Sequence, residues 1–182
     1  HCASLALLRR IRELEPAVAT VIGGANCEGP MGLATHRAFP WVDYVVSGEA
    51  DLLFPELCRT ILDEREMPSR PGLLAPTHRR PGACPADGAF LRAQLEDLDR
   101  SPTPDYDYYF EALAASPLGS SIRPGLLAET SRGCWWGQQQ HCAFCGLIGE
   151  GMRFRSKSPP KVRAEWRRLS KRHGLRGIEA VD

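Results

Sequence analysis

The chain has 182 residues, of which 43% are hydrophobic and 25% charged, and its formal net charge is +1. These proportions exclude a disordered chain and are those of a globular protein with one ordinary domain or two small ones. A net charge this close to zero gives no bulk electrostatic reason to expect nucleic acid or an acidic membrane as a partner. No apolar run approaches the length of about 18 residues that a transmembrane helix needs.

The first 65 residues alternate between predicted helices and strands. Apolar residues at three-residue spacing predict an amphipathic first helix, and a continuous run of small and branched apolar residues at 17–22 is typical of a strand buried on both faces. Residues 42–46 predict a second strand of the buried type. The helices are expected at residues 3–15, 31–38 and 51–65, and the strands at residues 17–22 and 42–46. This rhythm is that of an open, doubly wound α/β sheet.

Glycines follow both predicted strands. Gly23 and Gly24 come directly after the first strand, and Ser47, Gly48 and Glu49 come after the second. Doubly wound sheets bind ligands outside the carboxyl ends of their strands, where glycine allows backbone to approach closely. Glycine after a strand is also simply a turn residue, and no phosphate-loop or G-x-G-x-x-G pattern is present. The residues alone therefore leave ligand binding and a plain turn both open.

Residues 68–122 have a different composition. Prolines are dense between residues 68 and 104, which predicts a linker with local structure. Within it we expect a small hairpin between residues 73–74 and 90–91, and a short aromatic-rich helix that opens at Asp105.

A complete βα unit is predicted beyond the linker. Residues 126–130 are expected to form a strand and residues 131–151 a long loop. A helix should begin after the N-cap Ser158 and end at Gly174, before another strand at residues 178–181. In a βα barrel the loop after the strand lies on the active-site face.

Three cysteines lie on this loop. Cys134, Cys142 and Cys145 have the spacing C-x7-C-x2-C, and the other four cysteines of the chain are scattered. An odd count without a secretory signal favours reduced thiols over a disulfide framework. Structural zinc requires four closed ligands, for which His141 is a candidate fourth. An iron–sulfur cluster is held by thiolates alone, so three thiolates on a four-iron cluster leave one iron open. We favour the cluster over zinc, and an incidental grouping is the third alternative.

The flanks of these cysteines carry a resemblance. The segments SRGCWWG, HCAFCGL and MRFRSKSP resemble cobalamin-binding enzymes of the radical S-adenosylmethionine superfamily, in particular the C-methyltransferases that act in peptide maturation. The common superfamily spacing is C-x3-C-x2-C with an aromatic residue before the last cysteine, a position that Phe144 occupies; the longer first gap is expected in this group. The upstream GGANCEGPMG and FPWVDYVVSGEAD resemble the second half of the cobalamin-binding domain of these enzymes.

The resemblance implies a set of cofactors and contacts. Cys134, Cys142 and Cys145 would ligate a 4Fe-4S cluster, S-adenosylmethionine would chelate the open iron, and Phe144 and Asp182 would lie beside S-adenosylmethionine. A 5′-deoxyadenosyl radical would activate a substrate carbon, and methylcobalamin would supply the methyl group. The groove for the cobalamin nucleotide would be lined by Gly23, Gly24, Ser47, Gly48 and Glu49.

The resemblance also implies partners and an organisation. The partners would be a ribosomally synthesised precursor peptide and an electron donor such as a flavodoxin or ferredoxin, in the cytoplasm, with neither nucleic acid nor membrane. Residues 1–67 would be the C-terminal part of a Rossmann-like cobalamin-binding domain, 68–122 a linker, and 123–182 the first βα unit of a partial TIM-type barrel. Both ends look cut, so we expect an internal fragment that is inactive alone.

The residues are also compatible with two other functions. One keeps both cofactors but performs a non-methylating cyclisation or rearrangement, and the other is a non-catalytic α/β binding module with a zinc-stabilised loop. Trp135 and Trp136 are expected either to shield the iron or to pack. His36 is interpreted as a surface helix residue, and the loop bearing Arg153, Arg155 and Lys157 as either ligand-attracting or a solvated basic loop.

Overall fold

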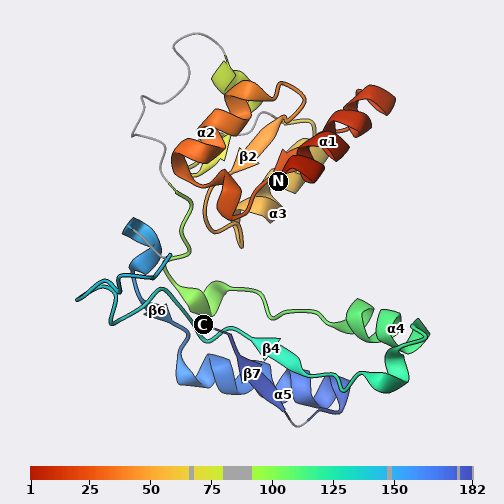
Figure 1. The fold of residues 1–182 in the computed structure, drawn as a ribbon, viewed down its shortest axis with the longest axis vertical. Helices are drawn as coiled ribbons and strands as arrows, with labels where there is room; N and C mark the ends of the chain where they lie inside the picture. The colour runs from red at the N-terminus through yellow and green to blue at the C-terminus, as the bar shows by residue number, and fades with distance from the viewer. Residues whose placement is uncertain (66–67, 80–91, 147–148, 176, 182) are drawn as a thin grey trace. The chain divides into compact units, whose positions relative to one another are not determined.

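A computed structural model describes residues 1–65, 68–79, 92–146, 149–175 and 177–181 of the chain (Figure 1). It divides into two compact units, His1–Leu95 and Glu96–Asp182. The division falls inside the stretch that we expected to be a linker. The described part of the chain is mixed α/β, as the sequence predicts.

The first unit is a three-stranded sheet with helices on both faces. Val21–Ile22 (β1) pairs in parallel with Tyr44–Val46 (β2), and β2 pairs antiparallel with Leu73–Leu74 (β3). The helices and 3-10 turns of this unit are α1 (Cys2–Leu14), η1 (Ala25–Cys27), α2 (Gly29–Ala38), α3 (Leu53–Leu62) and η2 (Pro76–Arg79).

The alternation of side chains along β2 divides the core of this unit in two. Val45 packs with Leu5 of α1 and Leu33 of α2, whereas its neighbour Val46 packs with Leu53 and Leu57 of α3. Successive residues of a strand point to opposite faces, so two adjacent valines bury helices on both sides of the sheet. This explains why the sequence has two adjacent valines at the end of this strand.

The strands of the first unit are shorter than predicted. β3 pairs with β2, whose Val45 lies opposite Leu74. Residues 90–91, the expected partner of β3, lie outside the described residues. Ala93 makes an isolated parallel bridge to Gly48, so the chain returns beside the carboxyl end of β2.

The second unit contains the predicted βα unit. Leu126–Ala128 (β4) pairs in parallel with Ile178–Ala180 (β7), and Pro159–His173 (α5) connects them. Ser131–Arg132 (β5) and Arg155–Ser156 (β6) form a short antiparallel ladder within the predicted loop. The remaining elements are η3 (Leu98–Arg100), α4 (Asp107–Ala115), η4 (Gly119–Ser121) and η5 (Gly149–Met152).

Helix α5 begins and ends as predicted. The Ser158 hydroxyl accepts a hydrogen bond from the Lys161 amide at 3.3 Å, Pro159 occupies the first turn, and Gly174 takes the left-handed conformation at φ 66°. The conformational preferences of these residues act within one helical turn, which is why the limits of the helix could be predicted from the sequence. Among the described helices, none has both the length and the apolar character that a membrane span requires.

Candidate functional site

The cysteine loop, residues 133–154, connects β5 to β6, and these two strands pair with each other. Ser131 lies opposite Ser156, and Arg132 lies opposite Arg155. The Glu129 carboxylate binds the Arg132 guanidinium through two hydrogen bonds of 2.6 and 2.9 Å. The Lys157 amide donates to the Thr130 carbonyl at 2.8 Å. Both ends of the loop are therefore tied to the strand that precedes it.

Cys134 is fixed firmly at the start of this loop. Its amide donates to the Met152 carbonyl at 3.1 Å, and its thiol accepts from the Gly137 amide at 3.2 Å. The preceding Gly133 has φ +81°, and a Cβ there would lie 2.2 Å from the Arg153 carbonyl oxygen. Only glycine combines this backbone conformation with such a close approach, so Gly133 determines the backbone position of Cys134.

Cys142 and Cys145 lie in a turn further along the loop. The Cys145 amide donates to the Cys142 carbonyl at 3.1 Å, and both residues are half-buried and free, like Cys134. Phe144 projects from this turn with 94% of its surface exposed. Within the described residues, no three His, Cys, Asp or Glu side chains converge in an arrangement that could hold a metal ion.

The donor chemistry of the loop fits a thiolate-bound metal centre. Three reduced thiols lie within twelve residues, and one already accepts an amide hydrogen bond, as thiolates at metal centres do. The arrangement of the thiols would have to close around a metal. Trp135 and Trp136, in the same loop, are 59% and 46% exposed and meet edge to face, with ring centroids 5.9 Å apart.

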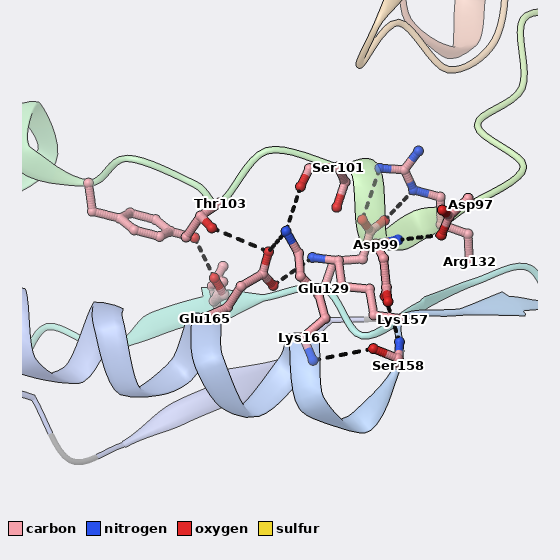
Figure 2. A network of polar contacts seen from close by, with 12 residues as sticks. Asp97, Asp99, Ser101, Thr103, Glu129, Arg132, Lys157, Ser158, Lys161 and Glu165 are labelled. Atoms are coloured by element: carbon pink, nitrogen blue, oxygen red, sulfur yellow. Dashed lines mark hydrogen bonds and ion pairs between the residues drawn. The ribbon is translucent and has the colours of Figure 1, made fainter.

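A buried ionic network includes Lys157, which follows directly after the cysteine loop and β6 (Figure 2). Glu165 of α5 is 3% exposed, and its carboxylate receives Lys157 at 2.9 Å and Lys161 at 3.1 Å. Thr103 also donates to it, at 3.4 Å, and Lys161 reaches the Ser101 carbonyl at 3.0 Å. Burying these charges is tolerable because the carboxylate is paired and hydrogen-bonded on both oxygens.

The network corrects one interpretation from the sequence. We allowed a solvated basic loop at Arg153, Arg155 and Lys157, but Lys157 is 5% exposed and Arg155 is 9% exposed. Arg153 is exposed and pairs with Glu96 at 2.8 Å. A lysine that follows a two-residue strand carries no periodic pattern, so nothing in the sequence signalled that it was buried.

A small apolar hollow lies at the carboxyl ends of β1 and β2. It has a volume of about 280 Å³ and is lined by Val21, Ile22, Gly23, Gly24, Val46, Gly48, Ala50 and Phe54. Three of the five predicted cobalamin contacts, the glycines, thus meet here. Among the described residues other than its two chain neighbours, no atom lies within 4 Å of where a Gly24 Cβ would be, so the backbone on that side is open to a ligand. Ala50 and Phe54 were not predicted, because neither belongs to a glycine motif.

The other two predicted contacts are used within the fold. The Ser47 hydroxyl is fully buried and accepts from the Gly29 amide at 2.9 Å. The Glu49 carboxylate accepts from the Leu95 amide at 2.9 Å, and the Glu49 amide donates to the Ala93 carbonyl at 2.8 Å. Both side chains therefore hold the turn after β2 in place. Asp182, the last predicted contact, lies outside the described residues.

The interpretation of His36 as a surface residue is wrong. It is 1% exposed, because the face of α2 that carries it packs inward. Arg79 donates to the His36 carbonyl at 3.1 Å and to the Phe39 carbonyl at 3.2 Å, and so caps the end of this helix. Burial, with the charge of Arg79 nearby, lowers the pKa of His36 to about 4. A ten-residue helix with small residues on two sides gave no clear apolar stripe from which this could be predicted.

The fold and the loop together define an α/β chain with a cysteine-rich loop at a strand end. No family model matches the sequence. The chain is similar to an uncharacterised methyltransferase of Pyrococcus horikoshii, with 28% identity over 172 residues, which cover 94% of this chain and 34% of that protein. It is also similar to the anaerobic magnesium-protoporphyrin IX monomethyl ester cyclase of Rubrivivax gelatinosus, with 27% identity over 173 residues, 92% of this chain and 29% of that protein.

Both relatives are named as enzymes, and both alignments run through almost the whole chain. The chain spans about a third of the length of the curated relatives that it matches. The similarity therefore includes both the glycine turns of the first unit and the cysteine loop of the second.

Proposed function

We propose that the chain belongs to a cobalamin-dependent radical S-adenosylmethionine enzyme that C-methylates a ribosomally synthesised peptide. The observation that carries the proposal is the set of three free thiols on one strand-end loop, in the spacing C-x7-C-x2-C. A relative that is named a methyltransferase supports the reaction class. When bound, a 4Fe-4S cluster with S-adenosylmethionine supplies an organic radical, and cobalamin supplies the methyl group.

The chain's own residues would divide the work between the two units. Cys134, Cys142 and Cys145 would hold the cluster, and the exposed ring of Phe144 is available to S-adenosylmethionine. The Glu129–Arg132 pair and the β5–β6 ladder would keep the loop ends still while the thiols close on iron.

In the first unit, the bare backbone of Gly23, Gly24 and Gly48 would receive the cobalamin nucleotide at the apolar hollow. Ser47 and Glu49 would act indirectly, because their side chains fix the turn that presents Gly48. A precursor peptide and a low-potential electron donor such as a flavodoxin or ferredoxin complete the proposal.

Anaerobic reconstitution of the full-length protein tests the cluster. We expect about four irons per chain, broad absorbance near 400 nm and release of 5′-deoxyadenosine, as a three-thiolate cluster requires. Cys142→Ala should abolish all three signals. Cys58→Ala is the matched control, because Cys58 is a half-buried free thiol on α3 of the first unit and is not one of the three cysteines of the loop. Iron retention and deoxyadenosine release by Cys142→Ala would refute the proposal, and one colourless zinc per chain would favour a binding module instead.

The second candidate function is a radical cyclisation or rearrangement with the same cofactors. It is favoured by the relative that is named a cyclase. S-adenosylmethionine labelled in its methyl group separates the two reactions. Methylation requires the label in the peptide product, whereas cyclisation yields an unlabelled product and deoxyadenosine.

A further inference from the structure

The three thiols of the cysteine loop are held very differently. Cys134 is bound through its amide to the Met152 carbonyl, through its carbonyl to the Gln138 amide at 3.0 Å, and through its sulfur to the Gly137 amide. The hydrogen bond between the Cys145 amide and the Cys142 carbonyl is a local one, which closes the turn that these two residues share. One thiol is thus placed in advance by its surroundings.

The terminal methyl of Met152 and the Cys134 sulfur border the same space beside Gly137. A Cβ added at Gly137 would fall 2.1 Å from the terminal methyl of Met152 and 3.5 Å from the Cys134 sulfur. The methyl, the Gly137 backbone and the sulfur therefore occupy one small volume. Met152 itself is only 9% exposed, although it belongs to the short turn η5 in the same loop as the exposed Phe144.

The space beside Gly137 is filled by the Met152 side chain. A side chain at residue 137 would displace the Met152 methyl, which is the flexible end of a long side chain and can move. The added methyl of an alanine would then lie 3.5 Å from the Cys134 sulfur, so the sulfur would keep an apolar neighbour. The amide of the same residue is the donor to that sulfur, so Gly137 has two roles at one atom.

We propose that Met152 and Gly137 are positioning residues for Cys134, which hold its sulfur in place and limit its contact with water before any metal arrives. An amide donor stabilises negative charge on sulfur, and an apolar cover restricts access to it. In the loaded protein, whose existence rests on the proposed function, the same two groups tune the reduction potential of the cluster, since hydrogen bonds to sulfur and solvent exposure set that potential.

Site-resolved alkylation of the metal-free protein tests the first part. With limiting iodoacetamide and peptide mass spectrometry, Cys134 should react several-fold more slowly than Cys142 and Cys145. Met152→Ala should accelerate Cys134 alone, and Met152→Leu should restore protection because it keeps the apolar bulk. Gly137→Ala should keep Cys134 protected, because its added methyl would lie 3.5 Å from the sulfur in place of the Met152 methyl.

Two results would overturn the positioning role. One is an unchanged Cys134 rate in Met152→Ala. The other is equal acceleration of all three cysteines, which would indicate general loosening of the loop. If Met152→Ala does not fold, the parent decides alone, since equal alkylation rates of the three cysteines would contradict a protected Cys134.

The loaded protein provides the second measurement. An electron paramagnetic resonance redox titration should show a shifted cluster potential in Met152→Ala and a potential close to the parent in Met152→Leu. Equal potentials in all three proteins would overturn the tuning role. Failure of the parent to assemble any cluster would instead contradict the proposed function. The alkylation pattern of the metal-free protein would still test the positioning role, because it does not depend on a cluster.

Discussion

The turn after β2 and the cysteine loop after β5 are both strand-end segments, but they are stabilised in opposite ways. In the turn, the side chains of Ser47 and Glu49 are consumed by backbone hydrogen bonds, and Gly48 packs against the returning chain at Ala93. In the loop, the fold fixes the two ends and Cys134, while the turn with Cys142 and Cys145 carries the exposed ring of Phe144. A rigid turn suits the recognition of a preformed ligand, whereas a loop that must close suits the assembly of a metal centre.

The largest effect on stability should come from the buried ionic network around Glu165. Glu165→Gln would leave Lys157 buried without its anionic partner, and breaking one partner of a buried pair costs about 3–5 kcal/mol of unfolding free energy. Urea unfolding measures this loss. Glu111→Gln on α4 is the control, because Glu111 is exposed and should change stability by less than about 0.5 kcal/mol. Equal losses in the two variants would mean that the loop does not depend on this network.

The framework of the first unit should respond to pH through His36. In the unfolded chain, His36 takes up a proton below its ordinary pKa of 6.5. In the folded chain, its pKa is lowered to about 4 by burial and by the charges of Arg79 and His78, whereas Asp43 acts in the opposite direction. The free energy of unfolding should therefore be highest above pH 6.5 and fall by about 3 kcal/mol on acidification to pH 4.

Urea midpoints between pH 7 and pH 4 measure this dependence. His36→Phe keeps an aromatic ring in the core and should flatten the profile over that window. His141→Gln, at an exposed position, should leave it unchanged. A profile for His36→Phe that is as steep as that of the parent would assign the acid sensitivity to other groups.

The rigidity of the turn after β2 is tested by two glycines with the same φ of 90°. A Cβ at Gly48 would lie 2.3 Å from the Ala93 carbonyl oxygen, whereas a Cβ at Gly24 meets no atom within 4 Å. Gly24→Ala should cost about 1 kcal/mol from backbone strain alone, and Gly48→Ala about 2–3 kcal/mol because the bridge to Ala93 must also open. Thermal or urea unfolding compares them, and equal costs would show that the Gly48–Ala93 contact contributes nothing.

The smallest effect should lie in the cysteine loop itself. Cys142→Ser in the metal-free protein should change the unfolding free energy by less than about 0.5 kcal/mol, because the loop contributes little to the core. Cys27→Ser, the same substitution at a fully buried position, should cost about 1–3 kcal/mol by burying a hydroxyl. A large loss in Cys142→Ser would remove the contrast between the two strand-end segments.

The sequence by itself determined the features that depend on local chemistry. The limits of α5 follow from Ser158, Pro159 and Gly174, whose backbone preferences act within one helical turn, and the structure confirms them. The α/β class and the βα unit between β4 and β7 were also predictable, since they follow from the alternation of apolar runs. The candidate ligands were found from the spacing of three cysteines, which is a property of the chain alone.

The tertiary structure decided which polar side chains are buried and what each of them contacts. Lys157 and Glu165 are eight residues apart across a helix start, and His36 and Arg79 are joined over 43 residues, so no sequence period could reveal either pair. Ser47 and Glu49 became parts of a turn only because residues 93–95 return beside them. Met152 came to lie against Cys134 because the β5–β6 ladder brings the two ends of the loop together. Such contacts depend on how distant segments close on one another, which local preference does not specify.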